Sequence, residues 1–222
     1  MLRVVSYNVH GLRDDRGALV EVVRDLDPDV LIVQEAPRRL RWRTRCAHLA
    51  HDLDLVYVTG GAPSLGNVIM TSLRVRAMDS WAIRYPLTPG RHLRGAAFAR
   101  CVADGASFVV AGSHLSLDAT ERQGQAELLR KELDGVDVPV ILGADLNETP
   151  TGPAWRLLAG GLVDPGGADG AATFPAAGDR GRIDAILVDP RITVTGYRVA
   201  DPPAARRASD HLPVVAELTL PV

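Results

Sequence analysis

Apolar residues recur along the chain with two different spacings. Short runs rich in Val, Ile and Leu predict β-strands, because such residues pack well on a pleated surface. These runs occupy residues 2–9, 30–35, 66–72, 75–83, 95–103, 107–115, 138–147, 182–189, 192–200 and 212–220. A helical spacing of apolar positions predicts helices at 17–26, 38–53, 119–133 and 153–159. Strands and helices are therefore expected to alternate throughout the chain.

Turn residues and burial predict how these elements are arranged. Asp104-Gly105 predicts a hairpin between 95–103 and 107–115, and 75–83 is expected to pair with 66–72. Several strands are apolar on both faces, which favours two packed sheets with helices outside them. We predict an α/β fold of the α+β type: a four-layer α/β/β/α sandwich of two mixed β-sheets flanked by helices, formed by one domain over residues 1–222.

The composition excludes several classes of protein. Of the 222 residues, 46% are hydrophobic, which is typical of a globular domain. No apolar run reaches the roughly 20 residues that span a bilayer. The N-terminal segment lacks the features of a signal peptide, so we expect a cytoplasmic protein, with a monomer as the default. Cys46 and Cys101 lie in no Cys/His pattern, which predicts two buried reduced thiols and no zinc site.

Small polar clusters stand at the ends of six separate predicted strands. They are Tyr7-Asn8, Gln34-Glu35, Ser113-His114, Asp145-Leu146-Asn147, Arg182-Ile183-Asp184 and Ser209-Asp210-His211. Asn, Asp and Glu are poor strand formers, and burying them without partners costs a few kcal/mol each. Six such clusters in one chain predict a shared site at the rim of a sheet.

Part of this set has the chemistry of a metal site. Asn8, Glu35 and Asp210 offer hard oxygen ligands, which favour Mg²⁺ or Mn²⁺ over zinc. Two or three protein oxygens leave room for waters and for phosphate oxygens of a substrate, the usual arrangement for Mg²⁺. The sequence therefore predicts a divalent metal held by these three residues.

The remaining members suit acid–base work on a phosphate. If the segment stays extended, Asp145 and Asn147 point to the same face, where they can orient a water and hold a phosphate oxygen. His114 and His211 are expected to act as imidazolium donors to phosphate oxygens. Asp184 is a natural partner to hold His211 and raise its pKa.

Each of these residues also has an ordinary structural explanation. The alternatives are a turn cap at Asn8, a solvated edge charge at Glu35, Asx turns at Asp145 and Asn147, a structural histidine at His114, a salt bridge between Asp184 and Arg182, and a cap formed by Asp210-His211. The six clusters taken together favour one shared site over unrelated caps.

The same segments, in the same order, resemble the motifs of the endonuclease/exonuclease/phosphatase superfamily. The matching segments are SYNVHGL, LIVQE, GNVIMTS, SHL followed by ERQGQAELL, ILGADLNETP, TFP, RIDAILV and SDHLPVVAEL, and they cover nearly the whole chain. In the fifth of these, Ala144 stands between Gly143 and Asp145, where the family has a Gly-Asp-x-Asn motif.

The resemblance implies a metal site and a set of catalytic roles. Asn8 and Glu35 would hold the metal, helped by Asp210. Asp145 would position or deprotonate the attacking water, and Asn147 would orient it.

It also implies roles for the two histidines. His211, tied to Asp184, would stabilise the pentacovalent phosphate, and His114 would do the same or assist the leaving group. Asn67 would be a helper residue in contact with the substrate. Abasic-site endonucleases resemble one another in having Tyr where this chain has His114, which argues against that branch of the family.

Arginines gather near the predicted site. Between residues 38 and 45 lie Arg38, Arg39, Arg41, Arg43 and Arg45, while Arg91 and Arg94 flank His92. Because guanidinium groups bind phosphate in a bidentate manner, we predict that Arg38, Arg41 and Arg94 bind a polyanionic substrate together with Asn67. The alternative is a composition bias, since Lys131 is the only lysine.

The sequence thus predicts a divalent-metal-dependent phosphoesterase, with a nuclease acting on DNA or RNA as the favoured form. One alternative is a phosphatase or phosphodiesterase acting on a small-molecule, inositol or lipid phosphate. A second is a non-catalytic binding protein on the same fold.

Overall fold

A computed structural model describes residues 1–168, 170–177 and 181–221. Over these residues the strands form two sheets. The six-stranded sheet has the order β10-β11-β1-β2-β4-β3, with β1 (Leu2–Asn8), β2 (Val30–Gln34), β3 (Val56–Gly60), β4 (Val68–Thr71), β10 (Thr193–Val199) and β11 (Val214–Thr219). The five-stranded sheet has the order β5-β6-β7-β8-β9, with β5 (Arg76–Arg84), β6 (Gly95–Ala103), β7 (Ala106–His114), β8 (Val140–Asp145) and β9 (Asp184–Val188).

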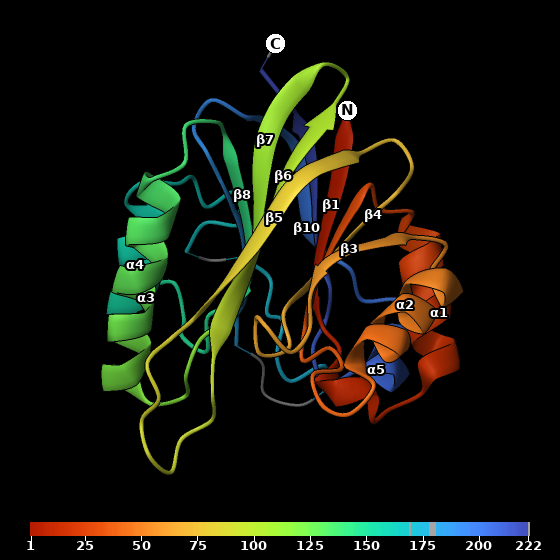
Figure 1. Ribbon diagram of the computed structural model, residues 1–222, viewed down its shortest axis with the longest axis horizontal. Coiled ribbons are helices and arrows are strands. Elements are labelled where there is room, and N and C mark those ends of the chain that lie inside the picture. The colour runs from red at the N-terminus through yellow and green to blue at the C-terminus, as the bar shows by residue number, and fades with distance from the viewer. Residues whose placement is uncertain (169, 178–180, 222) are drawn as a thin grey trace.

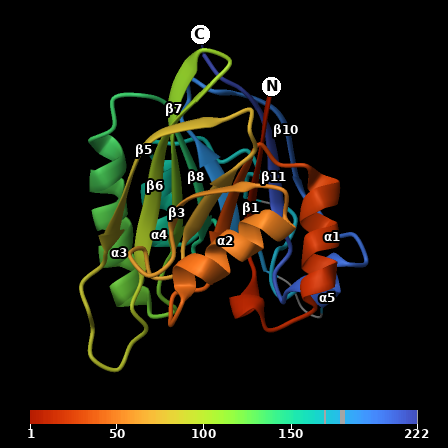
Figure 2. The same ribbon diagram turned by 45° about the vertical axis from the view of Figure 1, so that its right-hand side comes forward.

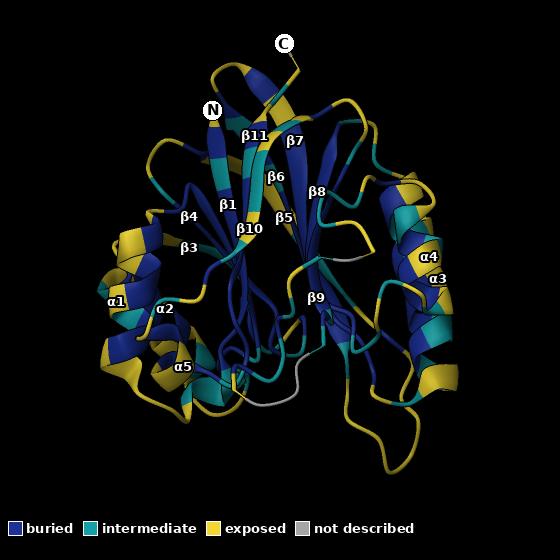
Figure 3. Cartoon of the chain, turned by 180° about the vertical axis from the view of Figure 1, so that it is seen from behind, coloured by how far each residue is buried: buried dark blue, intermediate teal, exposed yellow. Residues whose placement is uncertain are grey.

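The helices cover the outer faces of the two sheets (Figure 1). Helices α1 (Arg16–Leu26), α2 (Trp42–Asp52) and α5 (Ala205–Ala208) pack on the six-stranded sheet, and α3 (Ala119–Asp134) and α4 (Pro153–Ala159) pack on the five-stranded one. A third apolar core fills the space between the sheets. The inner strands are therefore buried along most of their length, whereas β3, β5 and β10 at the sheet edges are partly or fully exposed (Figure 3). The predicted four-layer sandwich of two mixed sheets is confirmed.

Two glycines let the sheets approach one another beside the polar strand ends. A Cβ atom added to Gly143 would lie 2.6 Å from Cδ1 of Ile32, and one added to Gly112 would lie 2.7 Å from Cγ2 of the same side chain. Gly143 comes two residues before Asp145, at the end of β8. The absence of a side chain at Gly112 and Gly143 therefore lets the two sheets pack closely where their polar ends meet.

Four details of the secondary structure differ from the sequence-based expectations. Strand β5 pairs with β6 in the other sheet and not with β4, because β2 and β3 already occupy both edges of β4. Strand β3 and the short helix α5 were not expected. Helix α2 begins at Trp42 and not at residue 38, because Arg41 has a left-handed backbone (φ 58°). The hairpin of β6 and β7 is confirmed.

Two further expectations concern the cysteines and membrane-spanning helices. Cys46 and Cys101 are free, buried thiols, as expected. No helix formed by the described residues combines the length and the apolar character that crossing a bilayer requires.

Candidate active site

The polar strand ends meet at the end of the sandwich that lies opposite the two chain termini (Figure 1). Asn8 is the last residue of β1, His114 the last of β7, and Asp145 the last of β8. Asp184 is the first residue of β9. The structure therefore brings residues from both sheets to one place, as the shared-site hypothesis requires.

Left-handed backbone conformations turn three site segments away from their strands. His10, Glu35 and Asn147 have φ values of 45°, 56° and 48°. Such conformations are uncommon for residues with a Cβ atom and cost roughly 1–2 kcal/mol each. Asn147 follows Asp145 through a turn in which its N–H donates to Oδ1 of Asp145 at 3.0 Å, so this segment is not extended as expected. The Asx-turn alternative is correct at this position, and the turn also places Asn147 in the site.

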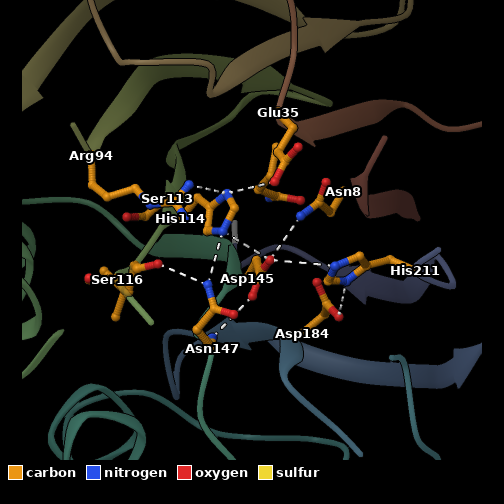
Figure 4. Close-up of polar contacts among 12 residues, drawn as sticks. Asn8, Glu35, Arg94, Ser113, His114, Ser116, Asp145, Asn147, Asp184 and His211 are labelled. Carbon is orange, nitrogen blue, oxygen red and sulfur yellow. Dashed lines mark hydrogen bonds and ion pairs between the residues drawn. The ribbon is translucent and has the colours of Figure 1, made fainter. Parts of the chain in front are cut away.

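The carboxylate of Asp145 is the centre of the hydrogen-bond network (Figure 4). Its Oδ2 accepts a hydrogen bond from Nδ2 of Asn8 at 2.8 Å and lies 3.2 Å from Nε2 of His114 and 3.8 Å from Nε2 of His211. Burial and the neighbouring charge of Asp184 raise the pKa of Asp145 to about 7, against the lowering effects of His211 and Asn8. A carboxyl group with this pKa can exchange a proton near neutral pH.

His211 is held as a charged ring by Asp184. Nδ1 of His211 lies 2.9 Å from Oδ2 of Asp184. Burial alone disfavours the charged ring, but Asp184, helped by Asp145 and Asp210, raises the pKa of His211 to about 9. The sequence predicts this pairing with Asp184, and in the structure Nε2 of the ring faces Asp145 at 3.8 Å. Asp184 does not form the alternative ion pair with Arg182, which binds Asp164 instead.

His114 is buried in the opposite charge state. Burial, followed by the nearby charge of Arg94, holds the pKa of His114 well below its usual value. The guanidinium of Arg94 can only donate and lies 2.9 Å from Nδ1 of His114, while Nε2 lies 3.0 Å from Nδ2 of Asn147 and 3.2 Å from Oδ2 of Asp145. Burial thus favours a neutral ring whose Nε2 faces Asp145, in place of the imidazolium expected from the sequence.

Three oxygen-bearing side chains suit a divalent metal. In the described part of the chain, the only polar contact of the Glu35 carboxylate is His114 at 4.0 Å. Among the described residues, the Asp210 carboxylate makes only long contacts, at 3.5 Å to Ser209 and 3.7 Å to His10. Oδ1 of Asn8 accepts one N–H, and all three ligand candidates line the same cavity. These weakly engaged oxygens fit a hard cation.

A second group of metal-ligand type lies beside them. Asp145, Asp184 and His211 offer ligand atoms within 4.8 Å of one another. However, a metal ligand must be an unprotonated imidazole, whereas Asp184 keeps the proton on His211. The charged ring thus suits proton handling, whereas the weakly engaged oxygens of the first set suit a cation.

The cavity above these residues has a volume of about 560 Å³ and includes only part of the predicted substrate-binding set. Arg38 and Arg94 line it, whereas Arg41 is exposed outside the lining. Asn67 is buried behind it, where Nδ2 donates to the carbonyl oxygens of Ser64 (2.9 Å) and Gly95 (2.8 Å). Asn67 thus joins two loops and does not reach the cavity.

Several residues of the site were not among the sequence-based candidates. Oγ of Ser209 donates to the carbonyl of Asn8 at 2.7 Å and accepts from the N–H of His211 at 3.2 Å, so it ties β1 to the histidine. Oγ1 of Thr173 accepts the N–H of Asp184 at 3.1 Å. Phe174 packs against the ring of His211, with centroids 4.6 Å apart. The sequence signals that could have indicated these residues are the Ser-Asp-His string at 209–211 and the Thr-Phe-Pro string at 173–175.

A buried carboxylate between two differently charged imidazoles, beside weakly engaged oxygen ligands, defines the class of metal-assisted phosphate-ester hydrolases on a two-sheet sandwich. Residues 5–211 match the Endonuclease/Exonuclease/phosphatase family, and the chain belongs to that family. Members of this family are hydrolases of phosphate esters, and the predicted enzyme class is confirmed.

Solved structures share the whole fold with this chain. A mannosyl-6-phosphatase of Bacteroides thetaiotaomicron is 20% identical, with a TM-score of 0.85 over 99% of this chain and 100% of that one. The human Nocturnin catalytic domain with a bound sulfate anion is 19% identical, with a TM-score of 0.80 over 99% and 94%. TDP2 of D. rerio complexed with a single-strand DNA product is 20% identical, with a TM-score of 0.78 over 98% of each chain. No curated protein sequence matches the chain.

Proposed function

We propose that this protein is a divalent-metal-dependent hydrolase of phosphate esters that uses Asp145 to handle the proton of the attacking water. The observation that supports it is the position of the Asp145 carboxylate, buried between Asn8, His114 and His211 at a cavity wall. Phosphoryl transfer depends mainly on positioning and on charge stabilisation, and this arrangement supplies both.

Each side chain around Asp145 has a separate task in this proposal. Asp145 accepts the proton of the water, because its pKa of about 7 lets it gain and lose a proton near neutral pH. Asn147 orients that water, since its amide is held beside His114 by donating to the carbonyl of Leu115 at 2.9 Å. The imidazolium of His211 and the neutral His114 donate hydrogen bonds to phosphate oxygens that gain charge in the transition state.

Asn8, Glu35 and Asp210 would hold the metal, with Mg²⁺ or Mn²⁺ as the expected ion. A bound divalent cation would neutralise charge on the phosphate and on the leaving oxygen. Asn8 has a second task, because its Nδ2 donates to Asp145 and keeps that carboxylate directed into the site.

Replacing Glu35 with Gln is expected to raise the Mg²⁺ concentration needed for half-maximal activity by about tenfold or more, because one anionic ligand becomes neutral. A metal titration of initial rates measures this, and high Mg²⁺ should restore part of the activity. Glu217→Gln, on β11 and outside the cavity, is the matched control. An unchanged requirement for metal in Glu35→Gln would rule out Glu35 as a ligand.

The cavity favours a small-molecule phosphate ester as substrate. Its volume of about 560 Å³ lies in the range of small-ligand sites, roughly 300–1,000 Å³. Among the described residues that line it, Phe174 is the only Phe, Trp or Tyr, and it packs on His211. A platform on which several bases stack is therefore missing from the described lining. A nuclease is the second candidate, because arginines surround the site.

Turnover of three substrates tests the proposal. Bis-p-nitrophenyl phosphate, p-nitrophenyl phosphate and plasmid DNA would each be incubated with Mg²⁺, Mn²⁺ or EDTA, beside Asp145→Ala. We expect metal-dependent hydrolysis of at least one p-nitrophenyl ester, lost in EDTA and in the variant. Cutting of plasmid alone would transfer the assignment to a nuclease. The absence of turnover of all three would contradict the proposed enzyme and favour the binding protein.

Salt dependence separates the two substrate classes. A protein that neutralises 6–10 phosphates loses roughly 10³–10⁵-fold in affinity between 50 and 200 mM salt. We expect kcat/KM of a single-phosphate ester to fall far less than 10³-fold over this range. Two results together would contradict the small-molecule assignment. A nucleic acid would have to be hydrolysed faster than the small esters, and its kcat/KM would have to fall steeply as salt rises. The cytoplasmic location and the monomeric state stay predictions.

A further inference from the structure

Cationic side chains that the proposed chemistry does not use line the same cavity as the catalytic groups. They are Arg13, Arg38, Arg39, Arg45 and His92. They come from four separate segments: the turn after the 3₁₀ helix η1 (His10–Leu12), the loop after β2, helix α2, and the loop between β5 and β6. Helix α2 and the β5–β6 loop both lie toward the end of the sandwich that holds the site (Figure 2). Folding thus concentrates positive charge from distant parts of the sequence.

Most of these arginine side chains have no partner among the described residues. The guanidinium groups of Arg13, Arg39 and Arg45 line the cavity and form no hydrogen bond and no ion pair within the described part of the chain. Arginines on other surfaces commonly bind a carboxylate, as in the pairs Arg16–Asp52, Arg24–Asp54, Arg91–Asp118, Arg100–Asp137 and Arg206–Asp201. A composition rich in arginine explains the number of these residues. It does not explain why four of them line one cavity, where their guanidinium groups meet no carboxylate among the described residues.

Arg38 is held in place in a way that leaves most of its donors free. Its Nη1 donates to the carbonyl oxygens of Leu65 at 2.9 Å and Leu93 at 3.1 Å, so the guanidinium joins two loops at the cavity. Among the described residues, Nε and Nη2 of Arg38 have no partner. A guanidinium fixed through one nitrogen keeps its other donors ready for an anion at a reduced entropic cost.

The scissile phosphate does not account for the arginines that line the cavity. In the proposed function, that phosphate is neutralised by the metal, by His211 and by His114. The unpaired arginines therefore face space that a second anion can occupy. Several guanidinium groups suit a phosphate dianion, because each presents paired N–H donors to its oxygens.

We infer that the substrate is a small phosphate ester that carries a second phosphate group, bound by Arg38, Arg39, Arg45 and Arg13 while the first is hydrolysed. This inference rests on the proposed function for the position of the scissile phosphate. The anion site itself depends only on the arginines, so binding and turnover can be measured separately.

Binding without turnover is the first arm of the test. Calorimetry in EDTA would measure the dissociation constant of glucose 1,6-bisphosphate for the wild type, for Arg39→Gln/Arg45→Gln and for Arg43→Gln/Arg76→Gln. The last variant removes the same charge from exposed residues that do not line the cavity. We expect about tenfold or weaker binding in the first variant, the effect of losing charge-assisted contacts, and wild-type binding in the control. Equal binding by all three proteins would overturn the anion site.

Turnover with Mg²⁺ is the second arm. We expect kcat/KM for glucose 1,6-bisphosphate to exceed that for glucose 6-phosphate by about tenfold or more, because KM for the bisphosphate is lower. In Arg39→Gln/Arg45→Gln, the two values of kcat/KM should become similar. Hydrolysis of both sugars at equal kcat/KM would overturn the inference and leave the proposed function standing. If the variant loses binding but the wild type hydrolyses neither sugar, the anion site stands and the proposed function is overturned. Tighter, arginine-dependent binding of a 5′-phosphorylated oligonucleotide would overturn the small-molecule class.

Discussion

Replacing Asp145 with Asn is expected to lower kcat by about 10³-fold, because the proton acceptor for the attacking water is lost while the shape of the side chain is kept. Removal of a general base typically costs 10²–10⁴-fold in rate. The measurement is the initial rate with saturating Mg²⁺ on the best ester substrate. Asp137→Asn, which changes an exposed carboxylate that contacts Arg100, is the matched control and should retain full activity.

A stability measurement separates this loss from unfolding. The pKa of Asp145 is raised in the folded protein, so ionisation of Asp145 destabilises the fold increasingly as pH rises from about 4 to about 7. Asn carries no charge and removes this penalty. The Tm of Asp145→Asn in EDTA at pH 8 should therefore equal or exceed that of the wild type. A large fall in Tm would show that inactivity comes from misfolding, and near-wild-type kcat would exclude Asp145 as the base.

Replacing His211 with Ala is expected to lower kcat by 10²–10³-fold with little change in KM, because the imidazolium stabilises charge that develops only in the transition state. The structure gives this ring its charge through Asp184 at 2.9 Å. Steady-state kinetics on one small ester would separate the two constants. His48→Ala, an exposed position on α2, is the matched control.

Asp184→Asn makes the same test more specific. It leaves the ring in place but removes the carboxylate that holds its proton, so we expect a loss of kcat of the same order as for His211→Ala. The double variant should lose little more than either single variant, because the two residues act as a unit. A loss confined to KM, or strictly additive effects, would contradict a role for this pair in the transition state.

The fold class was predictable because burial leaves a strong trace in the sequence. Strands β2 and β8 are apolar on both faces, and such strands need a layer on each side. The pairing of β5 was not predictable, because β4 and β5 are adjacent in sequence and the competition of β3 for the edge of β4 is visible only in three dimensions. Their closeness in sequence favours a hairpin of β4 and β5, but β3 already occupies the edge of β4 that β5 would need.

The candidate site was predictable where residue type alone decides chemistry. The hydrogen bond that Nδ1 of His211 donates to the carboxylate of Asp184 follows from one acid and one imidazole at two strand ends of the same site. The charge of His114 could not be foreseen, because Arg94 reaches it from a loop twenty residues earlier in the chain. The separation of Arg38 from Arg41 depends on the left-handed turn at Arg41, which has no clear signal in the sequence.

The position of β11 has a consequence for biosynthesis. Strand β1 pairs with β11 so that Leu2 faces Leu218, and β11 begins at Val214, shortly after Asp210 and His211. Because β1 precedes β11 in the chain by about two hundred residues, β1 is synthesised long before the strand that covers its edge. The site therefore cannot assemble before Asp210, His211 and β11 have been synthesised, and until then the edge of β1 stays open to pairing with another chain.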